Sequence, residues 1–259
     1  MPRQSRQNSE TGIYHVMLRG INRENIFLDI NDYETFLRVL HNQVYPIDEQ
    51  RKPLPPHCTL YAYCLMPNHV HLLIRERTER ITAIMKSVAI SYAWHFSRKY
   101  QHIGHVFQDR FKSEPVNDEA YFLTLLRYIH QNPVAAGLST NVLDYQWSSW
   151  REYEGIINLL CDTKAIQNRI PMTELRELVN EPLPKTSLVL DIENERRRIT
   201  DDEVVNYLVS TFGLRKPSDV LLLSNSKQMY IIKQAREYGA SIRQIERLTG
   251  IAFSLIRKL

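Results

Sequence analysis

Residues 66–74 constrain the fold more than any other stretch, because a Met-Pro-Asn turn leads there into an apolar run with two histidines, His69 and His71. Side chains alternate along a strand, so both histidines would share one face with Leu73 while the residues between them fill the other face. The pattern therefore predicts a strand that buries one face and presents two imidazoles on the other. Two neutral imidazoles can ligate one divalent cation, although a half-exposed strand also explains the spacing.

A helix over residues 118–132 can supply a third ligand and a nucleophile. Tyr128 and Asn132 are four residues apart, so they would lie on one face of that helix. Pro133 disfavours the helical conformation at the residue before it, so we expect the helix to end near Asn132. Tyr128 would then present its phenol from the last turn, with the Asn132 amide oxygen within reach of a cation. A core tyrosine beside a helix stop is the structural alternative.

The order of the expected elements indicates an α+β fold. The expected strands and extended segment cover residues 13–18, 59–65, 69–74 and 106–116, and the expected helices cover residues 32–44, 82–100 and 118–132. This order is the split βαβ arrangement of a ferredoxin-like fold, with one helix beyond the last strand. It would place the two histidines on a central strand beneath the helix that carries Tyr128.

Composition agrees with a nucleic-acid partner without proving one. The 259 residues carry a net charge of +4, which is a mild bias toward polyanions. The three cysteines form no CxxC pair, and no apolar run has membrane length, so we expect a cytoplasmic protein with reduced thiols and no membrane partner.

Taken together, these segments resemble the single-tyrosine HUH transposases, and most closely the REP-associated tyrosine transposase branch. The matching segments follow the family order over roughly residues 10–155. They are the first strand and loop (14–20, 22–23 and 26–27), the histidine strand (66–74), the nucleophile helix and turn (128–134 and 136–138), and a closing segment (147–149 with Tyr153).

The resemblance implies that His69 and His71 bind Mg²⁺ or Mn²⁺, that Asn132 is a third ligand, and that Tyr128 is the nucleophile. It implies a transposase that cleaves and rejoins single-stranded hairpin DNA through a covalent phosphotyrosine, with a 5′ linkage and a free 3′-hydroxyl. The chemistry agrees, because a cation can stabilise charge on phosphate and a covalent intermediate conserves bond energy for rejoining. A replication or conjugation nickase and a hairpin-binding repressor without cleavage remain alternatives, as do monomer and homodimer.

Basic and aromatic residues interleave between residues 86 and 112, where five Lys or Arg face one acidic residue. Cations can follow a phosphate backbone while rings stack on bases, although a solvated helix face gives the same pattern. The expected DNA contacts are Arg98, Lys99, Arg110 and Lys112, together with Arg19 and Arg23 after the first strand.

The sequence changes character after residue 155, so we expect a domain at 1–155, a partly helical linker at 156–199 and a helical domain at 200–259. Thr200 and Glu203 form a capping-box pattern that starts a helix. Residues 241–259 have the pattern of a helix-turn-helix, and the region from 199 loosely resembles the DNA-binding C-terminal domain of the bacterial replication initiator DnaA. Arg243 and Arg247 are the expected contacts to duplex DNA, with a solvated helix face as the alternative.

Overall fold

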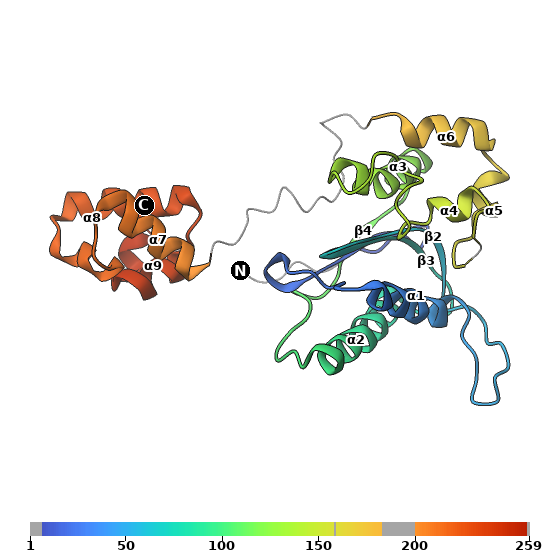
Figure 1. The fold of residues 1–259 in the computed structure, drawn as a ribbon, viewed down its shortest axis with the longest axis horizontal. Helices are drawn as coiled ribbons and strands as arrows, with labels where there is room; N and C mark the ends of the chain where they lie inside the picture. Colours follow the sequence, from blue (N-terminus) through green and yellow to red (C-terminus); the bar gives the residue numbers. More distant parts are fainter. Residues whose placement is uncertain (1–6, 158, 183–199, 258–259) are drawn as a thin grey trace. The chain divides into compact units, whose positions relative to one another are not determined.

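A four-stranded antiparallel sheet organises the N-terminal part of the chain in the computed structural model, which describes residues 7–157, 159–182 and 200–257 (Figure 1). The strands are β1 (Ile13–Arg19), β2 (Cys58–Met66), β3 (His69–Glu76) and β4 (Lys112–Pro115), in the order β2-β3-β1-β4. A short 3₁₀ helix, η1 (Ile21–Arg23), and one α-helix separate β1 from β2, another α-helix separates β3 from β4, and β2 and β3 form a hairpin. This arrangement confirms the ferredoxin-like α+β fold predicted from the sequence.

Helices cover both faces of this sheet (Figure 1). Helices α1 (Ile30–Val44) and α2 (Ile81–Tyr100) pack on one face, and α3 (Glu119–Ala135) packs on the other. Each face has its own hydrophobic core. Val70 and Leu72 join the first core, whereas Leu73 joins the second, because neighbouring residues of β3 point to opposite faces. The histidines of β3 therefore lie beneath α3, as predicted. The core on the α3 side also contains residues of three further helices, α4 (Trp150–Tyr153), α5 (Lys164–Gln167) and α6 (Met172–Asn180).

The end of α3 differs from the prediction, because the helix continues through Pro133 to Ala135. Proline removes one backbone donor, but the N–H of Ala136 still reaches the carbonyl of Asn132 at 3.0 Å. Two residues after the helix, Gly137 has a φ of +69°, a left-handed conformation that glycine adopts without strain. The expected extended segment at 106–116 is also shorter, because β1 pairs with β4 only from Tyr14 to Met17.

The expected linker begins later than residue 156, because the following residues pack on α3. Leu175 and Val179 of α6 are fully buried in the core beneath α3. Arg127 donates to the carbonyls of Glu181 and Pro182, which fixes the chain after α6 against the same helix. Residues 159–182 thus belong to the first of two compact units, 1–190 and 191–259, and residues 183–199 of the expected linker lie outside the described residues.

The second unit is helical, as predicted. The capping box of Thr200 and Glu203 is present, and Ser241 forms a second one with Gln244. Gly250 ends α9 at a φ of +80°, after which Glu246 accepts a hydrogen bond from the N–H of Phe253 at 3.1 Å. None of the helices in the described ranges has the length and hydropathy of a membrane-crossing segment. The elements of this unit are α7 (Asp201–Phe212), η2 (Pro217–Leu222), α8 (Asn225–Tyr238), α9 (Ile242–Thr249) and α10 (Phe253–Ile256).

Candidate functional site

Two adjacent strands bring three histidines to the sheet face beneath α3. His69 and His71 come from β3, and His15 comes from β1, where it pairs with Leu73. Residues directly opposite each other in antiparallel strands share a face, so all three rings lie on the α3 side together with Arg19, the partner of His69. His15 was not among the predicted site residues, because its position depends on the register between β1 and β3.

His15 and His71 form a direct contact in the interior. The Nε2 atom of His15 lies 3.0 Å from the Nδ1 atom of His71, and the two rings are nearly parallel, at 17°, with their centroids 5.2 Å apart. Burial lowers the pKa of His15 to about 4 and holds the pKa of His71 well below its usual value, so both rings are neutral at neutral pH. Within the described part of the chain, His71 Nε2 and His15 Nδ1 are buried without a hydrogen-bond partner.

The orientation of His69 follows from Asn68. The Nδ2 atom of Asn68 donates to the carbonyl of Arg23 at 3.0 Å, which turns the amide oxygen of Asn68 toward His69. That oxygen lies 2.6 Å from His69 Nδ1, so Nδ1 is the protonated nitrogen in the neutral ring of His69. The ring of His69 is 5.0 Å from the ring of His71 and nearly perpendicular to it.

Helix α3 places Tyr128 against the histidines. Its ring is 5.4 Å from the ring of His71 and 6.1 Å from the ring of His15, with an edge-on geometry in both cases. Tyr121, two turns earlier, donates instead to the carboxylate of Glu114 at 2.5 Å. Burial and this hydrogen bond raise the pKa of Tyr121. The structure therefore brings Tyr128 to the histidines and engages the phenol of Tyr121 elsewhere.

The other polar residues near the end of α3 have distinct environments. Asn132 is half-buried, and its Nδ2 atom donates to the carbonyl of Tyr128 at 3.3 Å, an arrangement that uses the amide nitrogen and not the oxygen. His130 is fully buried, donates to the carbonyl of Leu126 at 2.8 Å and meets the hydroxyl of Ser149 at 2.8 Å. Burial lowers the pKa of His130 to about 4. His130 thus points away from the Tyr128 face, as its position in the helix predicts.

The imidazoles of His69 and His71 fit a divalent cation. Within the described ranges, no group of three or more His, Cys, Asp or Glu side chains has the arrangement of a metal cluster. A site built from two imidazoles and an amide oxygen falls outside that definition, and these donors suit several divalent ions. The buried Nε2 atom of His71 supports the fit, because a buried ring nitrogen without a partner gains from ligating a cation.

Positive charge is concentrated beside the histidines. Lys112 of β4 pairs with Met17, and Arg19 follows Met17 by two residues on the same face of β1. Burial and the nearby guanidinium of Arg19 lower the pKa of Lys112, and burial and Arg23 lower the pKa of Arg19. Neighbouring positive charges repel each other, which lowers the pKa of each group. An anion such as phosphate would be stabilised next to them.

Two of the other predicted DNA contacts lie on the face of the sheet opposite the histidines. Lys99 of α2 contacts Asp29 at 2.7 Å and Asp32 at 2.9 Å, which ties the end of α2 to the start of α1. Arg98 stacks over the exposed ring of Trp94 on the same helix. The structure therefore gives Lys99 a structural contact that the sequence prediction did not include.

The remaining predicted contacts are dispersed. Arg110 is exposed in the loop before β4. In the second unit, Arg243 is exposed on α9, whereas Arg247 forms an ion pair with Asp201 that joins α9 to α7.

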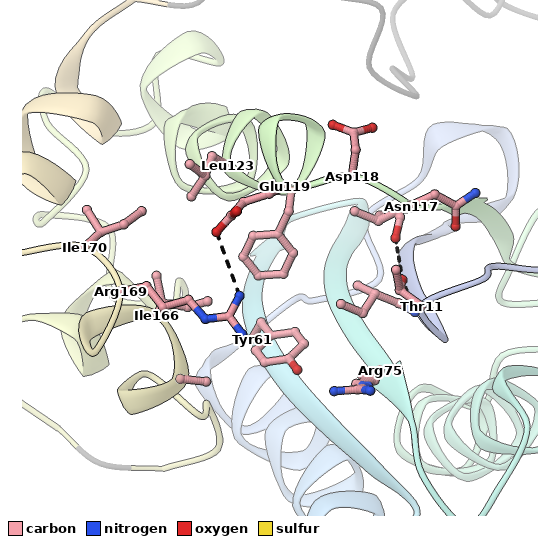
Figure 2. A pocket seen from close by; sticks show the side chains of 14 residues that line it. Thr11, Tyr61, Arg75, Asn117, Asp118, Glu119, Leu123, Ile166, Arg169 and Ile170 are labelled. Atoms are coloured by element: carbon pink, nitrogen blue, oxygen red, sulfur yellow. Dashed lines mark hydrogen bonds and ion pairs between the residues drawn. The ribbon is translucent and has the colours of Figure 1, made fainter.

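A cavity of about 220 Å³ lies at the start of α3 (Figure 2). Tyr61, Leu123 and Ile166 contribute apolar walls, and Glu119 and Arg169 meet across the rim at 3.8 Å. The residues that line it include neither Tyr128 nor the three histidines, so it is separate from the site beneath α3.

Comparison with known proteins gives a family match over the N-terminal part of the chain. Residues 8–132 match the family model described as "Transposase IS200 like". The chain is similar to the solved structure of a REP-associated tyrosine transposase bound to a REP hairpin, with 16% identity, a TM-score of 0.47, and coverage of 61% of this chain and 90% of that chain. It is also similar to a candidate transposase from Deinococcus radiodurans R1, with 18% identity, a TM-score of 0.33, and coverage of 49% of this chain and 95% of that chain. No curated protein matches it.

Proposed function

Because residues 8–132 match the model of the IS200-like transposases, we propose that the chain is a transposase that cleaves and rejoins single-stranded DNA through Tyr128. The observation that carries the proposal is the position of Tyr128, whose ring lies 5.4 Å from His71 on a sheet face that also carries His69 and His15. In this proposal His69, His71 and Asn132 hold Mg²⁺ or Mn²⁺. Bound there, the cation would stabilise negative charge on the scissile phosphate.

The residues of the site divide the work of a transesterification. Tyr128 Oη forms a bond to phosphorus while the bond from phosphorus to the 3′-oxygen breaks. The phenol loses one proton and the leaving 3′-oxygen gains one, so no proton is consumed overall. Arg19 and Lys112 supply positive charge for the phosphate, which lies at the sheet face between them and the histidines in this proposal. The covalent phosphotyrosine conserves the bond energy that rejoining needs.

We propose a folded single-stranded hairpin as the substrate. The similar REP-associated transposase has been solved with a REP hairpin, and this chain has the same order of family motifs. The second unit would bind duplex DNA, with Arg243 as an exposed predicted contact.

A covalent-adduct assay tests this function directly. The full chain is incubated with Mn²⁺ and a labelled single-stranded hairpin, and adducts that survive denaturation are counted. Tyr128→Phe should abolish the adduct and still bind the hairpin, because only the nucleophilic oxygen is lost. The matched control is Tyr121→Phe, since this phenol is bound to Glu114 and should leave the adduct intact. An adduct that persists in Tyr128→Phe and disappears in Tyr121→Phe would reverse the assignment.

Mixing two inactive variants distinguishes a monomer from a homodimer that acts in trans. Tyr128→Phe lacks the nucleophile, and His71→Ala lacks a proposed metal ligand. If the tyrosine of one subunit serves the metal site of another, a mixture of the two variants should recover adduct formation. A monomer, or a dimer acting in cis, gives no adduct in the mixture.

A further inference from the structure

The unassigned residue of the site is His15. It is fully buried on β1, the family motifs give it no role in the proposed reaction, and its ring contacts His71 directly. We infer that His15 is a positioning residue whose Nε2 atom accepts the Nδ1–H of His71 and so keeps the Nε2 atom of His71 unprotonated toward the proposed metal site. This inference depends on the proposed function only for the identity of the species that His71 would bind, a divalent cation.

The contact between the two rings allows two proton arrangements. At 3.0 Å, one nitrogen must donate and the other must accept, because two N–H groups or two lone pairs would repel each other at this distance. If His15 donated, His71 would carry its proton on Nε2, where it could bind no cation. If His71 donates, its Nε2 atom carries a lone pair. Either arrangement leaves one buried N–H without a partner, but only the second leaves a lone pair on the ring beside His69.

The neighbouring histidine supports the second arrangement. Asn68 accepts the Nδ1–H of His69, and the bond from Asn68 to the carbonyl of Arg23 fixes that direction. With His15 as the acceptor for His71, both histidines of β3 would present Nε2 and would have their Nδ1–H groups satisfied. Ligand histidines usually donate their second ring N–H to such an acceptor, which sets the tautomer and the orientation of the ring. The planes of the two rings differ by only 17°, so a hydrogen bond between the two nitrogens can lie close to both ring planes.

The experiment measures the tautomer of His71 and the binding of Mn²⁺ separately, both on the full chain. Long-range ¹H–¹⁵N spectra of protein with ¹⁵N-labelled histidine, recorded without metal, report which ring nitrogen is protonated, and the His71 signals are assigned by their loss in His71→Gln. Mn²⁺ affinity is measured by calorimetry without DNA. We compare wild type with His15→Leu, which removes the acceptor, and with His15→Gln, whose side-chain oxygen can accept the same hydrogen bond.

We expect the Nδ1–H form of His71 in wild type and in His15→Gln, and the loss of that form in His15→Leu. Mn²⁺ affinity should fall about 10- to 100-fold in His15→Leu, the usual effect of removing an acceptor behind a ligand, and should be largely restored in His15→Gln. The matched control is His130→Leu, which removes another fully buried histidine of the same unit with partners away from the site. That variant should lower thermal stability and leave Mn²⁺ affinity unchanged.

Three results would overturn the inference. They are an Nε2–H form of His71 in wild type, an unchanged tautomer and Mn²⁺ affinity in His15→Leu, and a His15→Gln variant that binds Mn²⁺ as weakly as His15→Leu. If wild type binds no Mn²⁺, the metal site of the proposed function fails, while the spectra recorded without metal still decide the role of His15. Covalent adduct formation tests Tyr128 independently of both.

Discussion

Lys99→Met should destabilise the N-terminal unit without weakening DNA binding, because the ammonium group of Lys99 is held by Asp29 and Asp32. The Asp32 carboxylate is fully buried, and burial by itself would raise its pKa. Hydrogen bonds outweigh that effect, with Lys99 the largest contributor, and the pKa of Asp32 falls from 3.8 to about 2. At about 1.4 kcal/mol per pKa unit, the folded state favours this charge by about 2 kcal/mol.

The effect has a defined pH dependence. Because the pKa of Asp32 is lower in the folded chain than in the unfolded one, its stabilisation is complete above about pH 4 and disappears as the pH falls through about 2. Tyr100 and a backbone N–H still contact Asp32 when Lys99 is replaced, so we expect Lys99→Met to lose about 1–2 kcal/mol at pH 7. The difference between variant and wild type should shrink below pH 4.

Urea unfolding followed by tryptophan fluorescence isolates this effect. All three tryptophans, Trp94, Trp147 and Trp150, lie in the N-terminal unit, so the signal does not report on the second unit. The matched control is Arg98→Gln, since its exposed stacking on Trp94 contributes little to stability. Hairpin affinity is measured on the same preparations. If Lys99→Met unfolds at the same urea concentration as wild type but binds the hairpin more weakly, the structural role is refuted and Lys99 is again a candidate DNA contact.

Three further predictions concern the site and the second unit. His69→Ala and His71→Ala should each abolish cleavage at low Mg²⁺ and leave the fold largely intact, and wild-type cleavage by either would exclude the metal site. Lys112→Gln should weaken hairpin binding and reduce its salt dependence by about one counterion, whereas an unchanged slope would remove it from the phosphate path. Deleting residues 200–259 should weaken target binding and flatten its salt dependence while cleavage of short hairpins persists, and an unchanged slope with a lower melting temperature would indicate a structural brace.

Local patterns in the sequence were sufficient to predict the elements that carry the site. The alternation in residues 69–74 assigns His69 and His71 to one face whatever the strand packs against, because the side-chain period of a strand is fixed. Helical spacing assigns Tyr128 and Asn132 to one face of α3 for the same kind of reason. These predictions depend only on residues close together in the chain, and the structure agrees with both placements.

The features that were missed depend on residues far apart in the chain. His15 reaches His71 only through the pairing of β1 with β3, and no local pattern specifies that register. The helical conformation beyond Pro133 and the packing of residues 159–182 both depend on contacts with the rest of the unit. Lys99 was expected to meet DNA because it lies in a basic stretch, but its partners, Asp29 and Asp32, are about 70 residues earlier.

The charges around Tyr128 support the proposal that a phosphate binds at this sheet face. His15 and His71 are neutral at neutral pH, because burial lowers the pKa of each, so their lone pairs are available to a cation or to each other. Arg19 and Lys112 keep their positive charges at the edge of the same face despite mutual repulsion. A phosphate next to them would relieve that repulsion, and His69 and His71 would hold a cation that stabilises its negative charge. The neutral histidines that would hold a cation and the charged side chains of Arg19 and Lys112 thus lie at separate positions of the face. Both could therefore stabilise the same phosphate.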